Sequence, residues 1–121
     1  MSDPRADLPD PIRALAETCA NAALDRKASD VVMLDVRGLT SIADWFVVAS
    51  GRSDTQVRAI AEAVEEACRA RQRRPLWVEG LRHGQWVLLD YGDVVVHVFR
   101  PEVRTFYNLE RMWAFGDQGA A

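Results

Sequence analysis

The sequence contains little that could build a metal centre or a disulfide framework, because its 121 residues include only two cysteines and two histidines. These residues, Cys19, Cys68, His83 and His97, stand at scattered positions without the spacing of a zinc site. Each cysteine falls on the apolar stripe of an expected helix, as small buried hydrophobic residues do. We therefore expect no metal, no cofactor and no disulfide, and free thiols are compatible with a reducing cytoplasm.

Long hydrophobic runs and a basic surplus are also missing. No apolar stretch approaches the roughly 20 residues that span a bilayer. The N-terminal residues MSDPRADLPDP carry acids and prolines where a targeting peptide would carry bases. The formal net charge of −3 argues against a dedicated nucleic-acid-binding protein. We expect a soluble, cytoplasmic protein.

What remains is an ordinary globular composition, with 49% hydrophobic and 27% charged residues. The length fits a single domain with a core of its own. We place this domain at residues 10–115, between flexible ends at residues 1–9 and 116–121.

Local patterns predict three helices and about five strands. Asp10 and Pro11 suit the N-cap and first turn of one helix, Ser53 starts a second with the capping box S-D-T-Q, and Pro101 opens a third. Apolar residues at helical spacing follow each start. Extended, often β-branched patterning predicts strands at residues 31–36, 44–50, 75–80, 85–91 and 93–99.

The element order α-β-β-α-β-β-β-α predicts an α/β fold. The last two strands should pair as a hairpin across Gly92 and Asp93. Residues 94–99 are apolar at both alternating sets of positions, so helices should cover both faces of this strand. We therefore predict a mixed sheet of about five strands flanked by helices.

The segment SGRSDTQ, residues 50–56, is the first candidate for an active site. It places glycine, serine and a helix N-terminus together, as phosphate-binding turns do, and it resembles the glycine-serine turn of nucleotidyltransferases. That chemistry needs two carboxylates on a neighbouring strand to hold metal ions, and no D-x-D pair follows. A capped helix start is the favoured interpretation, and a nucleotide-binding or nucleotidyltransferase-fold enzyme is the alternative. Because no nucleophile motif accompanies either histidine, we predict that the protein is not an enzyme.

Four arginines gather in RARQRRP, residues 69–75, at the end of the second expected helix. Cations at that end complement the helix dipole, and a charge run is usually a solvated surface. A contact between Arg69, Arg71, Arg73 and Arg74 and RNA phosphates is the other interpretation.

Aromatic rings and carboxylates gather near the end of the chain's most apolar stretch. Trp86, Asp90, Tyr91 and Asp93 are expected to cluster around one turn of the final hairpin. A core alone has no use for two carboxylates at a turn. The stretch is therefore either a hairpin that packs in the core and exposes only its turn, or a recognition edge, which means a sheet edge that binds a partner.

Three blocks carry a specific resemblance: LDVRGLTSIADWFVVASG (34–51), PLWVEG (75–80) and WVLLDYGDVVVHVFRPEVRTFYNLERMW (86–113). Over about residues 12–114 the chain resembles the ribosomal silencing factor family, also called the iojap-like family. The resemblance implies a nucleotidyltransferase-like α/β fold without the transferase metal site. It also implies a translational repressor that docks on ribosomal protein fourteen of the large ribosomal subunit and sterically prevents the small subunit from joining when nutrients fall.

Carried over to this sequence, the resemblance makes Trp86 and Tyr91, with Asp90 and Asp93, the partner-facing residues. Aromatic anchors supply much of the energy of an interface, and acidic residues suit the basic surface of a ribosomal protein. Under this interpretation the hairpin is a recognition edge built on core strands.

The resemblance leaves other possibilities open. Relatives commonly carry a glycine before the proline of PLWVEG, whereas arginine stands there in this chain, and some have leucine in place of Tyr91. Family members also form dimers, for which the aromatic C-terminal helix with Phe106, Tyr107 and Trp113 is a candidate surface. A large-subunit assembly factor that contacts ribosomal RNA through the arginine run is a further alternative.

Overall fold

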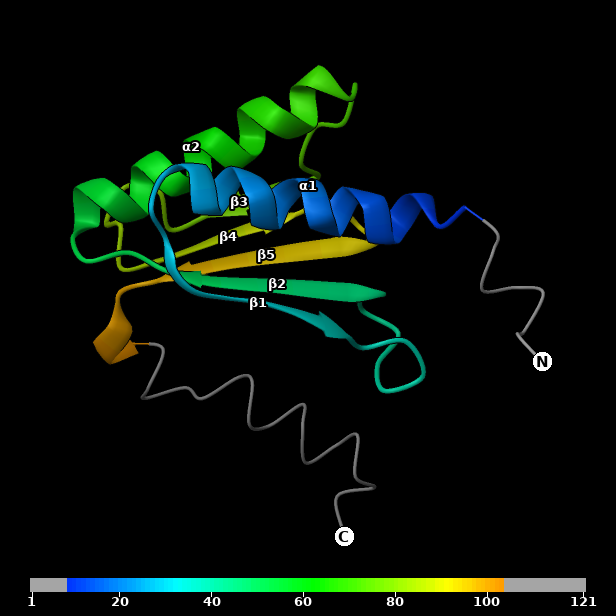
Figure 1. The fold of residues 1–121 in the computed structure, drawn as a ribbon. Helices are drawn as coiled ribbons and strands as arrows, with labels where there is room; N and C mark the ends of the chain where they lie inside the picture. The colour runs from blue at the N-terminus through cyan, green and yellow to red at the C-terminus, as the bar shows by residue number, and fades with distance from the viewer. Residues whose placement is uncertain (1–8, 104–121) are drawn as a thin grey trace, which may run out of the picture.

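A computed structural model describes residues 9–103, which include one mixed five-stranded sheet, the helices α1 and α2, and a short helical segment at residues 101–103 (Figure 1). The sheet order is β1-β2-β5-β4-β3, with β2 parallel to β5 and the other neighbours antiparallel. In chain order the elements are α1 (Pro11–Asp25), β1 (Ser29–Asp35), β2 (Trp45–Ser50), α2 (Asp54–Ala70), β3 (Trp77–Glu79), β4 (Trp86–Asp90) and β5 (Val94–Phe99). The predicted mixed α/β sheet is confirmed. Neither of the two helices is long and apolar enough to cross a membrane.

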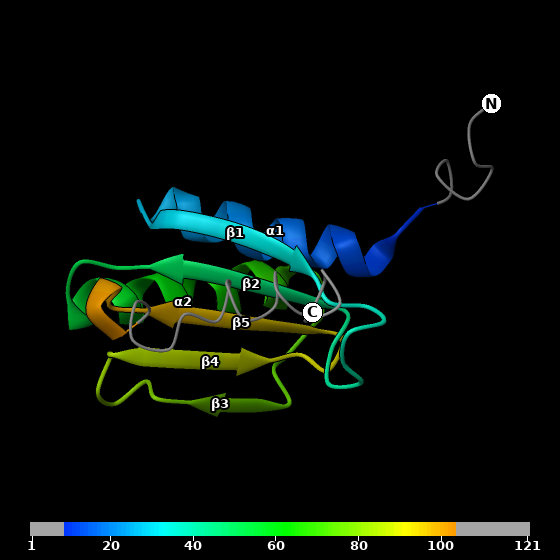
Figure 2. The same ribbon diagram turned by 90° about the horizontal axis from the view of Figure 1, so that it is seen from below.

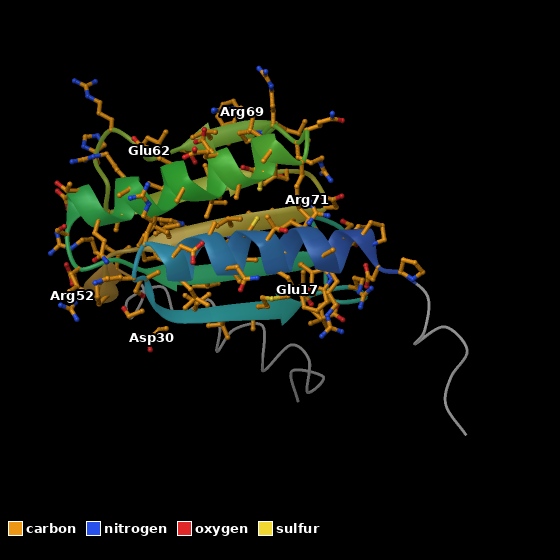
Figure 3. The ribbon with its side chains drawn as sticks, turned by 45° about the horizontal axis from the view of Figure 1, so that its top comes forward. Glu17, Asp30, Arg52, Glu62, Arg69 and Arg71 are labelled. Carbon is orange, nitrogen blue, oxygen red and sulfur yellow. The ribbon has the colours of Figure 1, made fainter. Side chains whose placement is uncertain are left out.

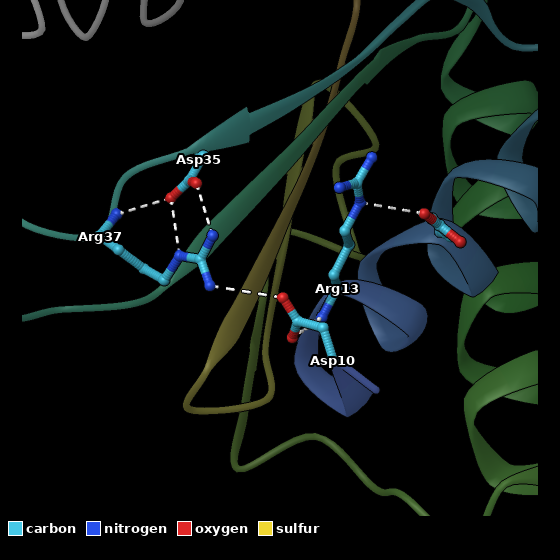
Figure 4. Close-up of polar contacts among 5 residues, drawn as sticks. Asp10, Arg13, Asp35 and Arg37 are labelled. Carbon is cyan, nitrogen blue, oxygen red and sulfur yellow. Dashed lines mark hydrogen bonds and ion pairs between the residues drawn. The ribbon is translucent and has the colours of Figure 1, made fainter. Parts of the chain in front are cut away.

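The predicted start of α1 is confirmed. The Asp10 carboxylate accepts a hydrogen bond of 3.0 Å from the backbone N–H of Arg13, and proline occupies the first turn of α1. Arg37 then joins this cap to the end of β1, because its guanidinium contacts both Asp10 and Asp35 (Figure 4). Hydrogen bonding from Arg37 lowers the pKa of Asp35.

The two helices lie on the same face of the sheet (Figure 1). Their apolar sides pack on alternate residues of β2, β4 and β5 to form the larger core. A smaller core around Phe46, Val95 and Phe99 lies on the opposite face. Every residue of β5 is buried, as its apolar pattern predicts. Residues 101–103, where a third helix is expected, are helical, and Val103 packs against the smaller core. Phe106, Tyr107 and Trp113, expected farther along this helix, lie outside the described residues.

The two cysteines are buried, as expected for small residues on the apolar sides of the helices, and they lie close together in space. The Sγ atoms of Cys19 on α1 and Cys68 on α2 lie 3.5 Å from one another where the helices pack. Residues separated by 49 positions are thus brought into contact by the fold. The hydrogen bond with Cys68 and burial raise the pKa of Cys19, so this thiol stays protonated.

Candidate partner-binding surface

The structure separates the residues that were expected to cluster at one turn. In the β4–β5 hairpin, Trp86 pairs with Phe99 at one end and Asp90 pairs with Val95 at the other. Four residues of extended strand correspond to about 13 Å. The prediction that Trp86 joins the acidic turn is therefore wrong, because β4 is extended over its whole length.

Side-chain alternation along β4 determines which residues are accessible. Val87 and Leu89 are buried against the helices, whereas Trp86, Leu88 and Asp90 face the other side and are partly exposed. These three residues therefore share the face that α1 and α2 do not cover.

Tyr91 follows Asp90 and points to the helix side. It is only 3% exposed and belongs to the larger core, where burial raises the pKa of its hydroxyl. A partner therefore has no access to Tyr91 in this structure, although Tyr91 was expected on the recognition surface. Its side chain instead packs in the core between the hairpin and the helices.

The two carboxylates at the turn of the hairpin accept hydrogen bonds from within the fold. Asp90 Oδ1 accepts a hydrogen bond of 2.7 Å from the N–H of Gly92, and Asp93 Oδ1 accepts one of 2.9 Å from Arg73. The Asp93 side chain is 27% exposed. Both carboxylates therefore shape the turn while keeping some contact with solvent.

Trp86 is held in a defined orientation. Its Nε1–H donates a hydrogen bond of 3.2 Å to Nδ1 of His97, and its ring lies 4.8 Å from that of Phe99. Because Nδ1 accepts, the proton of the neutral imidazole is on Nε2. His97 is buried, and burial lowers its pKa to about 4.

The neighbouring edge strand extends this surface. In the β3–β4 ladder, Trp77 lies opposite Asp90 and Glu79 lies opposite Leu88, so both project to the same face as Trp86. Trp77 is 59% exposed, an unusual state for tryptophan. From the face opposite the two helices, β4 and β3 lie side by side at one edge of the sheet (Figure 2).

We call this surface the β3–β4 patch and define it as Trp77, Glu79, Trp86, Leu88 and Asp90. Glu79, Trp86 and Leu88 line a hollow of about 300 Å³ within it. The patch combines two indole rings, an aliphatic side chain and two carboxylates, which suits a protein partner with apolar and basic groups. No group of three potential metal ligands occurs among residues 9–103.

Sequence reasoning missed Trp77, Glu79 and Leu88. The signal was present in PLWVEG, because Trp77 and Glu79 are alternate residues around the partly buried Val78. The sequence pattern does not reveal that β3 lies at the edge of the sheet, where Trp77 and Glu79 are exposed.

The second half of the SGRSDTQ segment starts α2. Ser53 Oγ accepts a hydrogen bond of 3.1 Å from the N–H of Gln56, and the Gln56 side chain accepts one from the N–H of Arg52. Asp54 in the first turn pairs with Arg100 at 2.8 Å, so a carboxylate already faces the positive end of the helix. The predicted capped helix start is confirmed.

Comparisons with known proteins agree with one another. Residues 9–120 match the family model described as "Ribosomal silencing factor during starvation". A ribosomal silencing factor from Zymomonas mobilis is 49% identical over 94 residues, covering 78% of this chain and 71% of that protein. One from Bacillus subtilis is 39% identical over 101 residues, covering 84% and 86%. A crystal structure of a Chromobacterium violaceum protein, 38% identical, superposes with a TM-score of 0.83 over 85% of this chain and 86% of that one.

Proposed function

The chain belongs to the ribosomal silencing factor family, and on this premise we propose that it binds the large ribosomal subunit at ribosomal protein fourteen and blocks joining of the small subunit by steric exclusion. It acts in the cytoplasm, chiefly when nutrients are limited. The proposed activity is that of a binding protein rather than an enzyme, and the family description supports a role in silencing ribosomes.

The β3–β4 patch is the observation that supports this proposal most directly. Tryptophan is enriched among the residues that dominate interface energies, and truncating a central one typically costs about 2 kcal/mol or more. Trp86 is also preorganised by His97 and Phe99, so binding loses little side-chain freedom there. These contacts favour Trp86 as the central anchor, with the more exposed Trp77 beside it.

Charge gives the patch a preferred kind of partner. Glu79 and Asp90 place two carboxylates beside the indole rings. Such a surface suits the basic surface expected of a ribosomal protein. Opposite charges across an interface speed association and disfavour wrong orientations. Of the four residues first expected to face the partner, Trp86 and Asp90 are proposed as contacts, while Asp93 and Tyr91 hold the hairpin in shape.

Light scattering of subunit joining tests the proposal. Purified large subunits are incubated with the protein before small subunits are added, using wild type, Trp86→Ala and Ile42→Ala. Ile42 is the control because it is a large hydrophobic residue that is 67% exposed and lies outside the patch. We expect wild type and Ile42→Ala to block joining, and Trp86→Ala to bind large subunits about 30-fold more weakly.

Two further measurements keep this result interpretable. Circular dichroism and thermal melting establish that Trp86→Ala is folded, since its side chain is partly buried. Glu79→Lys reverses an exposed charge without removing a packed ring, and it should slow association with large subunits. A folded Trp86→Ala protein that binds as tightly as wild type would sink the assignment of the anchor, and wild type that leaves joining unchanged would sink the proposed function.

A further inference from the structure

The arginine run ends α2 and leads into β3, and it borders a hollow in the surface. The hollow has a volume of about 260 Å³. Its lining consists of Glu65, Arg69, Arg73, Arg74 and Pro75, and we call it the arginine hollow. A concentration of guanidinium groups contrasts with the net charge of −3 of the whole chain. The four arginines of the run do not share one role.

Arg71 and Arg73 are engaged in the fold. Arg71 donates a hydrogen bond of 2.8 Å to the hydroxyl of Thr18 on α1. Arg73 donates to the backbone carbonyl of Tyr91 at 3.1 Å and to the carboxylate of Asp93 at 2.9 Å. These two side chains therefore tie the end of α2 to α1 and to the β4–β5 hairpin.

Arg69 and Arg74 have no such role. Both are exposed, and within residues 9–103 no hydrogen bond or ion pair engages either guanidinium group. Glu65 lines the same hollow but forms no ion pair with Arg69. Two positive groups are thus presented to solvent beside an arginine whose position is fixed by the fold.

The end of α2 does not need these guanidinium groups as caps. The N–H of Gln72 donates to the carbonyl of Arg69 at 2.8 Å, and the N–H of Arg73 donates to that of Cys68 at 2.9 Å. Gln72 has the left-handed φ of 62° that this backbone capping motif requires. Because the backbone satisfies these carbonyls, hydrogen-bonded capping does not explain Arg69 and Arg74.

The hollow lies next to the β3–β4 patch along the chain. Pro75 lines the hollow, Leu76 follows with 75% exposure, and Trp77 begins the patch. Because Pro75 and Trp77 are two residues apart, a protein that docks on the ribosome through the patch holds this end of the hollow close to the edge of that contact. On a ribosomal subunit the surroundings of a protein contact are rich in RNA, whose phosphates bind guanidinium groups through charge-assisted, often bidentate hydrogen bonds.

We propose that Arg69 and Arg74 bind the phosphodiester backbone of ribosomal RNA next to the protein contact made by the β3–β4 patch. This inference rests on the proposed function, since it requires docking on the large subunit. It divides the surface into an acidic and aromatic region for protein and a basic region for RNA. Arg71 and Arg73 position the turn that carries the two RNA-binding side chains.

Salt dependence of large-subunit binding tests the inference. Each phosphate contact contributes about 0.7 to 0.9 to the slope of log affinity against log salt. Between 50 and 200 mM salt, wild type should therefore lose about tenfold more affinity than the double variant Arg69→Ala with Arg74→Ala. The pair Arg69→Lys with Arg74→Lys keeps both charges and should retain most of the slope.

Arg52→Ala is the matched control, because Arg52 is also exposed but lies at the opposite end of α2 from Arg71 (Figure 3). It should behave as wild type. A double alanine variant with the slope and affinity of Arg52→Ala overturns the inference while leaving the proposed function intact. Wild type that does not bind large subunits overturns both.

Isolated ribosomal protein fourteen distinguishes RNA from an acidic protein surface as the ligand of the arginines. With RNA absent, the double alanine variant should bind this protein as wild type does, whereas Trp86→Ala should bind it more weakly. Equal weakening of the double variant on the isolated protein and on whole subunits would show a protein contact and overturn the RNA assignment.

Discussion

Acidification from pH 7 to pH 4 should destabilise the fold through a single buried imidazole. His97 is 6% exposed, and burial lowers its pKa from 6.5 to about 4. Between these two values the unfolded chain binds a proton that the folded chain excludes. The free energy of unfolding therefore falls as the pH drops below 6.5 and levels off below about 4. Each unit of difference corresponds to about 1.4 kcal/mol, so the loss over this range is about 3 kcal/mol.

Urea denaturation at several pH values between 7 and 4 measures this loss. Carboxylates titrate over the same range, so wild type has to be compared with His97→Asn, which carries the same carboxylates. The Asn side-chain oxygen can still accept from Nε1 of Trp86, but it does not titrate. We expect the stability advantage of wild type over His97→Asn to shrink by about 3 kcal/mol from pH 7 to pH 4.

The other histidine provides the control. His83 is exposed in the loop between β3 and β4, so His83→Gln should leave the pH dependence of wild type unchanged. If the free energies of unfolding of wild type and His97→Asn change in parallel between pH 7 and pH 4, the argument that His97 is buried in its neutral form beneath Trp86 is refuted.

Three further substitutions test local features by chemical denaturation. Gly80→Ala should destabilise the fold by about 2 kcal/mol more than Gly38→Ala. Both glycines have positive φ, but only at Gly80 would an added Cβ clash with the carbonyl of Trp86, so equal losses of stability would contradict this explanation. Ser53→Ala should cost about 1 kcal/mol by uncapping α2 while large-subunit binding is unchanged. The nucleotide alternative instead requires that magnesium-dependent nucleotide binding, measured by calorimetry, be present and weakened by Ser53→Ala. Arg73→Ala should cost about 1 to 2 kcal/mol by removing donors to a carbonyl and a carboxylate, and unchanged stability would show that these bonds contribute nothing.

Most elements could be predicted from the sequence because their signals are local. The Asp10 and Ser53 caps, the apolar spacing of the helices and the hairpin across residues 92–93 each depend on neighbours in the chain. The strand order was not predicted. The parallel pairing of Trp45 with Val94 joins residues that local periodicity does not connect. The contact between the two cysteines was missed for the same reason.

The candidate site was predicted only in part. The sequence singled out Trp86 and Asp90, which lie on the accessible face of β4. It also grouped Asp90 with Tyr91, although adjacent strand residues point to opposite faces and Tyr91 is buried. Trp77 was missed because its exposure follows from the position of β3 at the sheet edge, which only the strand order determines.

To exclude a subunit sterically, a small protein has to be held in one orientation. The arrangement of charge on this chain favours a single orientation. The β3–β4 patch carries carboxylates, whereas the arginine hollow, which begins two residues away along the chain, carries the guanidinium groups of Arg69 and Arg74, for which no ion pair forms within residues 9–103. A partner site in which a basic protein lies beside RNA phosphates complements this pattern in one direction only, because a reversed protein would bring like charges together. Under the two proposals, the aromatic anchors therefore supply most of the affinity, and the opposed charges fix the direction in which the protein projects toward the incoming small subunit.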